Sequence, residues 1–181
     1  MRFIRFAELE TRPWKNGGGV TREIAALREN NDVLWRLSIA DVAVDGPFSV
    51  FKGLTRILMV IEGTGLRLVS AESIVHARNG MPVTFDGGLP IQSELMDGPI
   101  RDLNVMFDPL RFEAHVALVN APIKTNANQT TAIIGLTGNT AVYSTQFLRF
   151  GDTALVENKA LEIEFPESAS ALIVTLNLRQ Q

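Results

Sequence analysis

Apolar and polar residues alternate along most of this chain, and turn-forming residues break the alternation at intervals of roughly ten residues. In the segment Leu34–Val42, for example, Leu37 and Ile39 fall on one face and Ser38 and Ala40 on the other. A period of two is typical of β-strands, whose successive side chains point to opposite faces of a sheet. Further segments that alternate or are rich in strand-forming residues are Thr55–Glu62, Asp102–Phe107, Leu161–Phe165 and Ala171–Leu178. Helical periodicity is scarce, so the pattern predicts many short strands.

The segments between the predicted strands contain residues that tolerate a positive φ or preset a turn. Examples are Asp45-Gly46-Pro47, Asn79-Gly80 and Asp86-Gly87-Gly88. The strands are too short and too numerous for an open sheet. We therefore expect an all-β sandwich or barrel, or two barrels in tandem.

The division between two such barrels is expected near Phe107–Arg111. Asp108-Pro109 would suit the start of a helix, because Asp is a good N-cap and Pro a good first helical residue. We favour a strand, since Phe112, Ala114 and Val116 alternate with other residues. The predicted domains are residues 1–108 and 109–181, with the N-terminal strand free to cross over between them.

Composition excludes several classes of function. The 181 residues contain no cysteine and only two histidines, His76 and His115. A disulfide scaffold, an iron–sulfur cluster and a thiol nucleophile are thereby excluded, and a three-histidine metal site cannot form within one chain. We expect no metal and no cofactor. The net charge of -3 argues against nucleic acid as a partner, because binding several phosphates requires a clustered positive surface.

No segment resembles a membrane span or a secretory signal. The longest aliphatic run, Ile57–Ile61, is far shorter than the ~20 apolar residues that cross a bilayer. Residues 1–12 lack the apolar stretch of a signal peptide. We expect a cytoplasmic protein without a membrane partner, and the sequence leaves a homo-oligomer open.

The most unusual stretch runs from Arg12 to Glu23 and contains the adjacent glycines Gly17, Gly18 and Gly19. Consecutive glycine N–H groups can surround an anion, and a neighbouring Lys or Asn side chain would complete such a nest. The stretch matches neither a Walker phosphate loop nor a dinucleotide fingerprint. The alternative is a glycine-rich hairpin that only allows a sharp turn.

Polar side chains also lie on strand faces that are otherwise apolar. Arg36 and Ser38 share a face, Arg56 begins a later strand, and Asp102 and Asn104 share a face of a third strand. If these faces line a barrel interior, they form a polar, positively charged pocket that suits a small acidic ligand. The alternative is that each charged side chain is solvated or forms an ion pair with a neighbour. We read both histidines as surface or core residues.

Several blocks of this sequence, in order, resemble the signature blocks of the HutD/Ves family. They are Pro13-Trp14-Lys15-Asn16-Gly17-Gly18-Gly19-Val20-Thr21-Arg22-Glu23-Ile24, Trp35-Arg36-Leu37-Ser38-Ile39-Ala40, Gly46-Pro47-Phe48-Ser49, Arg56 with Glu62-Gly63-Thr64-Gly65, and Asp102-Leu103-Asn104-Val105-Met106. The first block is long and rare, so the resemblance is specific, and the resemblance as a whole covers roughly residues 1–110. The resemblance implies a bicupin, which is two small antiparallel β-barrels of the RmlC-like cupin jelly roll in one chain. It implies no cupin metal triad.

The resemblance also implies a set of ligand-binding residues. Carried onto this chain, the set is Trp14, Lys15, Asn16, Gly18, Thr21, Glu23, Arg36, Ser38, Ser49, Arg56, Asp102 and Asn104. Members of the family are associated with bacterial histidine utilisation, and some with stress responses. The resemblance thus implies a protein that binds a small organic acid, such as formylglutamate or a related intermediate of histidine degradation, in a regulatory or stress-linked role.

Three functions follow as hypotheses. The first is a non-catalytic bicupin that holds a carboxylate through Arg36 or Arg56. The second is a metal-independent hydrolase or isomerase in which Glu23 or Asp102 is a general base. The third is a protein interaction module, for which we would expect a filled barrel interior. The sequence favours the first and assigns no catalytic residue.

Overall fold

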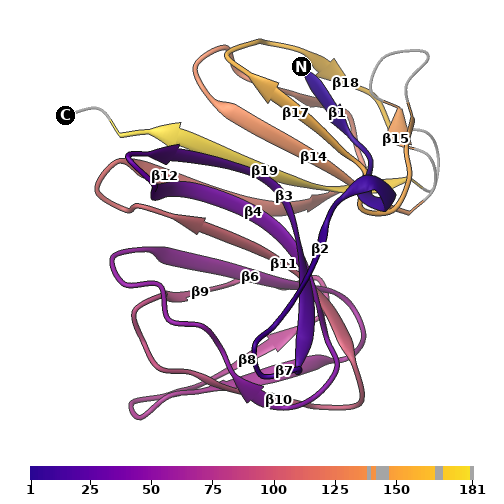
Figure 1. Cartoon of the computed structure of the whole chain (residues 1–181). Coiled ribbons are helices and arrows are strands. Elements are labelled where there is room, and N and C mark those ends of the chain that lie inside the picture. Colours follow the sequence, from indigo (N-terminus) through magenta and orange to yellow (C-terminus); the bar gives the residue numbers. More distant parts are fainter. Residues whose placement is uncertain (138–139, 142–146, 166–168, 180–181) are drawn as a thin grey trace. The chain divides into compact units, whose positions relative to one another are not determined.

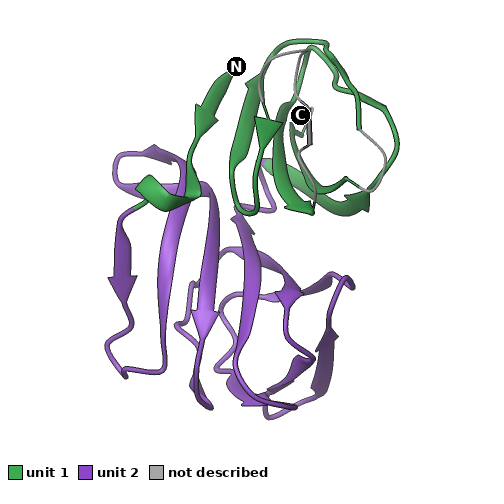
Figure 2. Cartoon of the chain, turned by 90° about the vertical axis from the view of Figure 1, so that its right-hand side faces the viewer, with its two compact units in different colours: residues 1–9, 112–181 green, residues 10–111 purple. Residues whose placement is uncertain are grey.

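The computed structural model describes residues 1–137, 140–141, 147–165 and 169–179. The chain divides into two compact units, one of residues 10–111 and one of residues 1–9 with 112–181 (Figure 2). Within the described residues, the only helical element is the 3-10 turn η1 (Phe6–Glu8), and every other regular element is a strand. The all-β prediction is confirmed. No helix in the described ranges is long and apolar enough to cross a membrane.

The unit of residues 10–111 contains two antiparallel sheets (Figure 1). The six-stranded sheet has the order β2 (Thr11–Pro13), β3 (Gly19–Glu29), β4 (Asp32–Val42), β11 (Ile100–Phe107), β6 (Thr55–Glu62) and β9 (Val83–Asp86). The four-stranded sheet has the order β5 (Gly46–Pro47), β10 (Gln92–Leu95), β7 (Gly65–Val69) and β8 (Ile74–Arg78). Because β4 and β11 are central strands, both of their edges pair with neighbouring strands.

The other unit contains one five-stranded sheet and two short ribbons. The sheet has the order β1 (Arg2–Ile4), β17 (Thr153–Glu157), β14 (Thr130–Thr137), β19 (Ser170–Leu178) and β12 (Phe112–Val119). The ribbons are β13 (Ile123–Lys124) with β18 (Glu162–Ile163), and β15 (Thr140–Ala141) with β16 (Phe147–Leu148). The core of this unit is aliphatic, with Ile133, Leu148 and Val156 among its buried members.

The N-terminal segment belongs to the unit that contains the C-terminal half of the chain. The predicted domains left the N-terminal strand free to cross over, and residues 1–9 group with residues 112–181. Strand β1 pairs with β17, and the side chain of Arg5 donates a 2.8 Å hydrogen bond to Asp152, 147 residues further along the chain. Local patterns carry no information about a pairing at that distance.

The segment after Asp108 is a turn followed by a strand, as we favoured. The Asp108 carboxylate accepts a hydrogen bond from the amide of Leu110, and its carbonyl accepts one from the amide of Arg111. These bonds close a tight turn, and β12 begins directly after it at Phe112. Asp108 therefore caps a turn where the alternative was the N-terminus of a helix.

The core of the unit of residues 10–111 lies between its two sheets. Its buried members are Val42, Phe48, Leu58, Val60, Leu66, Leu68, Ala77, Ile91 and Ile100. Strands β4, β6 and β11 contribute to this core from one side and β7 and β8 from the other. We call the surface of β4, β6 and β11 that faces this core the inner face.

The inner face changes from apolar to polar along its length. Val42 and Ile100 are opposite one another in the β4–β11 register. Further along, the register pairs Ala40 with Asp102, Ser38 with Asn104 and Arg36 with Met106. Since alternate residues of a strand share a face, these pairs continue the surface that holds the core. One end of the barrel interior is therefore filled by aliphatic side chains, and the other end is lined by polar ones.

The contacts of Asp152 predict how the N-terminal segment is held. Its carboxylate is 6% exposed and accepts hydrogen bonds from the Arg5 side chain and from the amides of Phe6 and Arg149. We expect Asp152→Ala to lower the free energy of unfolding by about 1–3 kcal/mol, because it leaves these donors unsatisfied. Urea denaturation measures this. Glu157→Ala, which removes an exposed carboxylate from the neighbouring strand β17, is the control and should change stability by less than about 0.5 kcal/mol. Equal effects of the two changes would contradict this account of Asp152.

Candidate functional site

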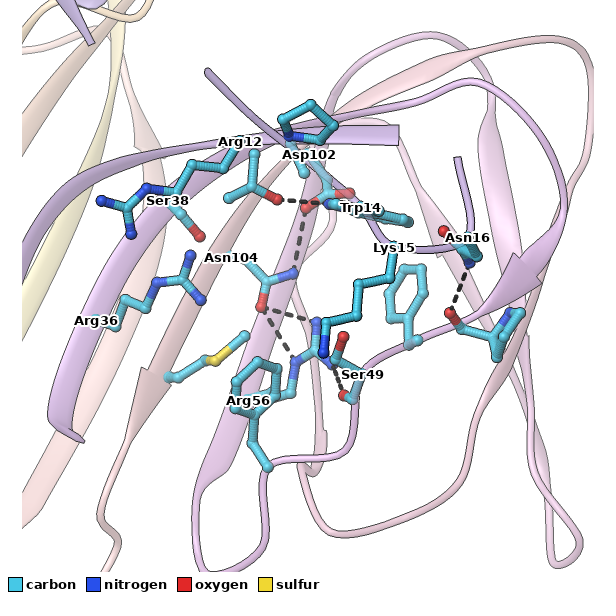
Figure 3. A pocket seen from close by; sticks show the side chains of 17 residues that line it. Arg12, Trp14, Lys15, Asn16, Arg36, Ser38, Ser49, Arg56, Asp102 and Asn104 are labelled. Atoms are coloured by element: carbon cyan, nitrogen blue, oxygen red, sulfur yellow. Dashed lines mark hydrogen bonds between the residues drawn. The ribbon is translucent and has the colours of Figure 1, made fainter. Parts of the chain in front are cut away.

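A cavity of about 500 Å³ opens at the polar end of the inner face (Figure 3). Its lining residues are Arg12, Pro13, Trp14, Lys15, Asn16, Thr21, Arg36, Ser38, Ala40, Pro47, Phe48, Ser49, Phe51, Arg56, Asp102, Asn104 and Met106. They come from strands β4, β6 and β11, from the β2–β3 hairpin, and from the segment between β5 and β6. The site thus combines a rigid sheet floor with walls made by two connections.

Arg56 is a buried cation at the floor of this cavity. It is 5% exposed, and its Nε and Nη2 donate hydrogen bonds of 3.2 and 3.1 Å to Oδ1 of Asn104. Its Nη1 donates a 3.3 Å hydrogen bond to the carbonyl of Ser49. Among the described residues, it makes no ion pair with a carboxylate.

Three aromatic rings surround the Arg56 guanidinium. The rings of Phe48, Phe51 and Phe85 have centroids 5.1, 5.6 and 5.0 Å from its central carbon. A cation is attracted to the face of an aromatic ring, and the rings also exclude water. Burial lowers the pKa of Arg56 to about 10, with Asp102 opposing this effect and Arg36 adding to it. The guanidinium nevertheless remains charged at neutral pH.

Asp102 is a fully buried carboxyl group on the same floor. Its relative exposure is 0%, and its Oδ1 accepts a 3.3 Å hydrogen bond from Nδ2 of Asn104. Its Oδ2 has no hydrogen-bond partner among the described residues. Burial raises the pKa of Asp102 to about 7, although the hydrogen bond from Asn104 and the charge of Arg56 lower it, and Asp41 raises it slightly further. Near neutral pH this group exists in both protonation states.

Asn104 connects these two groups. It accepts hydrogen bonds from Arg56 through its carbonyl oxygen and donates one to Asp102 through its amide nitrogen. Arg56, Asn104 and Asp102 therefore form a chain of hydrogen bonds from β6 to β11, which Figure 3 shows as dashed lines. These hydrogen bonds fix the orientation of the Asn104 side-chain amide, because its carbonyl oxygen must face the Arg56 guanidinium.

Three further basic side chains line the cavity: Arg12, Lys15 and Arg36. Nε of Arg36 lies 2.9 Å from Oε2 of Glu23, an ion pair that lacks the alignment of a hydrogen bond. Arg12 forms an exposed ion pair with Glu10. Lys15 makes no ion pair within the described part of the chain. Positive charge without an acidic partner therefore remains at Lys15 and at Arg56.

The β2–β3 hairpin forms one wall of the cavity and is held by side-chain contacts. The indole N–H of Trp14 donates a 2.7 Å hydrogen bond to Oγ1 of Thr21, and the Trp14 ring meets Phe48 edge to face at 5.8 Å. Asn16 accepts a hydrogen bond from the amide of Gly18. Gly19 must lack a side chain, because a Cβ would lie 2.4 Å from the carbonyl oxygen of Asp41.

The structure brings together all the predicted site residues except Gly18 and Glu23, which do not line the cavity. The amide of Gly17 already donates to the carbonyl of Trp14, and that of Gly18 to the Asn16 side chain, so the first two glycines present no free anion nest. The Glu23 carboxylate is engaged by Arg28 and Arg36. Burial raises the pKa of Glu23, but these ion pairs outweigh burial and lower it overall.

Sequence reasoning missed several residues that line the cavity: Arg12, Pro13, Ala40, Pro47, Phe48, Phe51 and Met106. Ala40 and Met106 could have been found, because each is two residues from a predicted site residue on the same strand face. Phe51 lies in an irregular connection, where no periodicity predicts the direction of a side chain.

The HutD family model matches residues 6–173, which is most of the chain and extends beyond the signature blocks. The chain belongs to the HutD family. A 21.2 kDa uncharacterised protein of Pseudomonas putida, named for its position in the hutC 3′ region, is 32% identical over 144 residues, covering 74% of this chain and 72% of that protein. Protein Ves of Cronobacter sakazakii is 32% identical over 127 residues, covering 69% and 70% of the two chains.

Solved structures agree with membership of the HutD family. The structure of HutD from Pseudomonas fluorescens, described as a formate condition, has a TM-score of 0.86 and 29% identity, with 99% of each chain covered. An oxalate decarboxylase variant from Bacillus subtilis has a TM-score of 0.65 at 10% identity, covering 98% of this chain and 77% of that one. At 10% identity, the likeness to oxalate decarboxylase shows the fold alone. The fold is that of a bicupin, built from cupin-type jelly rolls.

The residues of this HutD-family cavity do not suit the metal that a cupin barrel can hold. Metal sites in proteins use combinations of histidine, cysteine and carboxylate ligands. The lining contains one carboxyl group, that of Asp102, and no histidine. Within the described ranges, no group of three or more such side chains is arranged to hold a metal ion. We derive no chemistry through a metal here.

The raised pKa of Asp102 predicts a pH-dependent effect on stability. An aspartate whose pKa is about 7 when folded and near 3.9 when unfolded binds more protons in the folded state, so it opposes folding as the pH rises from 4 to 7. Asp102→Asn removes this titration. We expect the variant to gain stability relative to the wild type between pH 5 and pH 8, by about 2–3 kcal/mol. Urea denaturation at both pH values measures the difference, and a constant difference would contradict the assignment.

Proposed function

We propose that the cavity binds a small organic acid and that Arg56 holds its carboxylate. N-formylglutamate and related acids from histidine degradation are the ligands to test first. This choice is supported by the name of the Pseudomonas putida relative, which refers to the hutC region. We further propose that the protein acts by binding, in a regulatory or stress-linked role, and catalyses no reaction.

The observation that carries the proposal is the buried charge of Arg56, which makes no direct ion pair with a carboxylate among the described residues. Taking a guanidinium out of water is costly unless an anion or several hydrogen bonds compensate it. The carbonyl oxygens of Asn104 and Ser49 and the surrounding aromatic rings supply partial compensation. Arg presents a planar fork of donors that matches a carboxylate. A carboxylate ligand would supply the negative charge that the protein does not place directly against the Arg56 guanidinium.

The rest of the lining suits a small acid with an aliphatic body. The rings of Trp14, Phe48 and Phe51 and the side chain of Met106 provide apolar walls. Lys15 has no ion pair within the described residues and would attract a second acidic group. Small-molecule sites typically combine such apolar walls with a few oriented polar groups. A dicarboxylate therefore fits the arrangement better than a neutral ligand.

A metal-independent enzyme is the second candidate, and Asp102 is the residue that favours it. A carboxyl group with a pKa of about 7 in a cavity has the property required of a general acid or base. Turnover of a bound acid by the purified protein, lost in Asp102→Asn with binding retained, would support this function. Unchanged ligand after prolonged incubation at high protein concentration would count against it. The interaction module required a filled barrel interior, and the cavity does not favour it.

Thermal unfolding with added acids tests the proposed function. A ligand present at 100 times its dissociation constant should stabilise the protein by about 2.7 kcal/mol. We expect such a shift with N-formylglutamate, glutamate, urocanate or formate. In Arg56→Lys, which retains the charge but loses the fork, the affinity should fall at least about tenfold.

The control variant is Arg78→Lys, the same substitution at an exposed position on strand β8. It should bind with wild-type affinity. If no acid shifts the unfolding temperature, the proposed function is wrong. If an acid stabilises the wild type and Arg56→Lys equally, the ligand binds elsewhere.

A further inference from the structure

The innermost charges of the cavity are those of Arg56 and Asp102. Both side chains are buried, and Asn104 joins them by hydrogen bonds. When both groups are ionised, this buried set has no net charge. A bound carboxylate would make it negative, and an excess buried charge is costly in a medium of low dielectric constant.

The charged groups on neighbouring elements are mostly compensated by ion pairs. On β4, Asp41 is paired with Arg22 and Arg101. The other acidic neighbour, Glu23 on β3, is paired with Arg28 and Arg36. Three other basic side chains line the cavity. Arg36 and Arg12 are in ion pairs with Glu23 and Glu10, and Lys15 is exposed. An exposed charge is screened by solvent and cannot offset a buried one fully.

We propose that the cavity takes up a proton together with its anionic ligand, and that Asp102 holds this proton. The inference rests on the proposed function, because it describes how the same site accommodates an acid. Protonation removes the charge of Asp102, and the carboxylate of the ligand then becomes the sole anion beside Arg56. The cavity thus binds the equivalent of the whole acid, carboxylate and proton together.

The geometry around Asp102 supports this assignment. Its Oδ2 is buried without a donor among the described residues, which is unfavourable for an anionic oxygen. Its single hydrogen bond, from Asn104 to Oδ1, leaves that second oxygen free to carry the proton. The pKa of about 7 in the absence of ligand means that protonation requires little work near neutral pH. An added anion next to the group raises the pKa further.

The sign of the pH dependence follows from this scheme. Below pH 7 Asp102 is already protonated, so the affinity for the acid is at its maximum. As the pH rises above 7, each binding event must also take up a proton, and the affinity falls by up to about tenfold per pH unit. Arg56, with a pKa of about 10, stays charged throughout this range.

Isothermal titration calorimetry with N-formylglutamate tests the inference. This probe has no free amine, and its carboxyl groups titrate near pH ~4, so it exchanges no protons between pH 6 and 8.5. Titrations at pH 6.5, 7.5 and 8.5 are each run in two non-anionic amine buffers that buffer at that pH and differ in ionisation enthalpy. We expect uptake of about half a proton per ligand near pH 7, rising toward one at pH 8.5, and an affinity at least about tenfold weaker at pH 8.5 than at 6.5.

Two variants show which group takes up the proton. Asp102→Asn should bind the probe with an affinity that does not change with pH and without proton uptake. His76→Gln, which replaces an imidazole outside the cavity lining, should retain the uptake. Uptake that persists in Asp102→Asn would overturn the assignment to Asp102.

The outcomes separate the inference from the proposed function. Binding of the probe without proton uptake and with a flat pH profile overturns the inference and leaves the function intact. Failure of the probe, formate, glutamate and urocanate to bind at any pH overturns the function, and with it the inference. If Asp102→Asn does not fold, carbon-13 NMR of the wild-type aspartate carboxyl groups decides. One aspartate carboxyl group should titrate near pH 7 without ligand and above pH 8 with ligand. If the midpoint of this titration stays the same when ligand is added, the proposal is contradicted.

Discussion

The burial of the Arg56 guanidinium is the constraint on which the site depends. A charge that is 5% exposed must be satisfied by its surroundings, and the lining supplies what that requires: the carbonyl oxygens of Asn104 and Ser49 and the faces of three phenylalanine rings. These groups come from two strands, β9 and β11, and from the connection between β5 and β6, which are distant in sequence. Their convergence on one cation fixes the floor of the cavity and one of its walls.

The same constraint shapes the inner face as a whole. The strands β4, β6 and β11 carry aliphatic side chains at one end and Arg36, Ser38, Asn104 and Asp102 at the other. The apolar end supplies the hydrophobic stabilisation of the unit, roughly in proportion to the apolar area it buries. The polar end contributes less to stability, because it contains a carboxyl oxygen without a partner. Such incomplete satisfaction is expected where a ligand completes the site.

A cupin-type barrel without suitable metal ligands would recognise the proposed acid through organic groups. In this HutD-family chain those groups are a guanidinium, an amide and a carboxyl of raised pKa in one hydrogen-bonded chain. The carboxyl group and the guanidinium respond to a bound anion together, because Asn104 links them. Recognition of an acid and control by pH would then be two properties of one set of residues.

The all-β fold and most of the site could be predicted from the sequence for one reason. A strand has a period of two, so Arg36 and Ser38, or Asp102 and Asn104, necessarily share a face whatever the register. The twelve-residue glycine block and the later blocks then identified the family. The turn at Asp108 is also held by a local contact, the hydrogen bond from the amide of Leu110 to the Asp108 carboxylate.

Other features depend on contacts between distant residues. The pairing of β1 with β17, the placement of Phe51 and Phe85 around Arg56, and the engagement of Glu23 by two arginines cannot be read from a local pattern. Burial is also set by the whole fold, and burial is what raises the pKa of Asp102. The sequence by itself determined which side chains share a strand face. Only the tertiary structure decided which of them are removed from water, because desolvation depends on every element packed around a group.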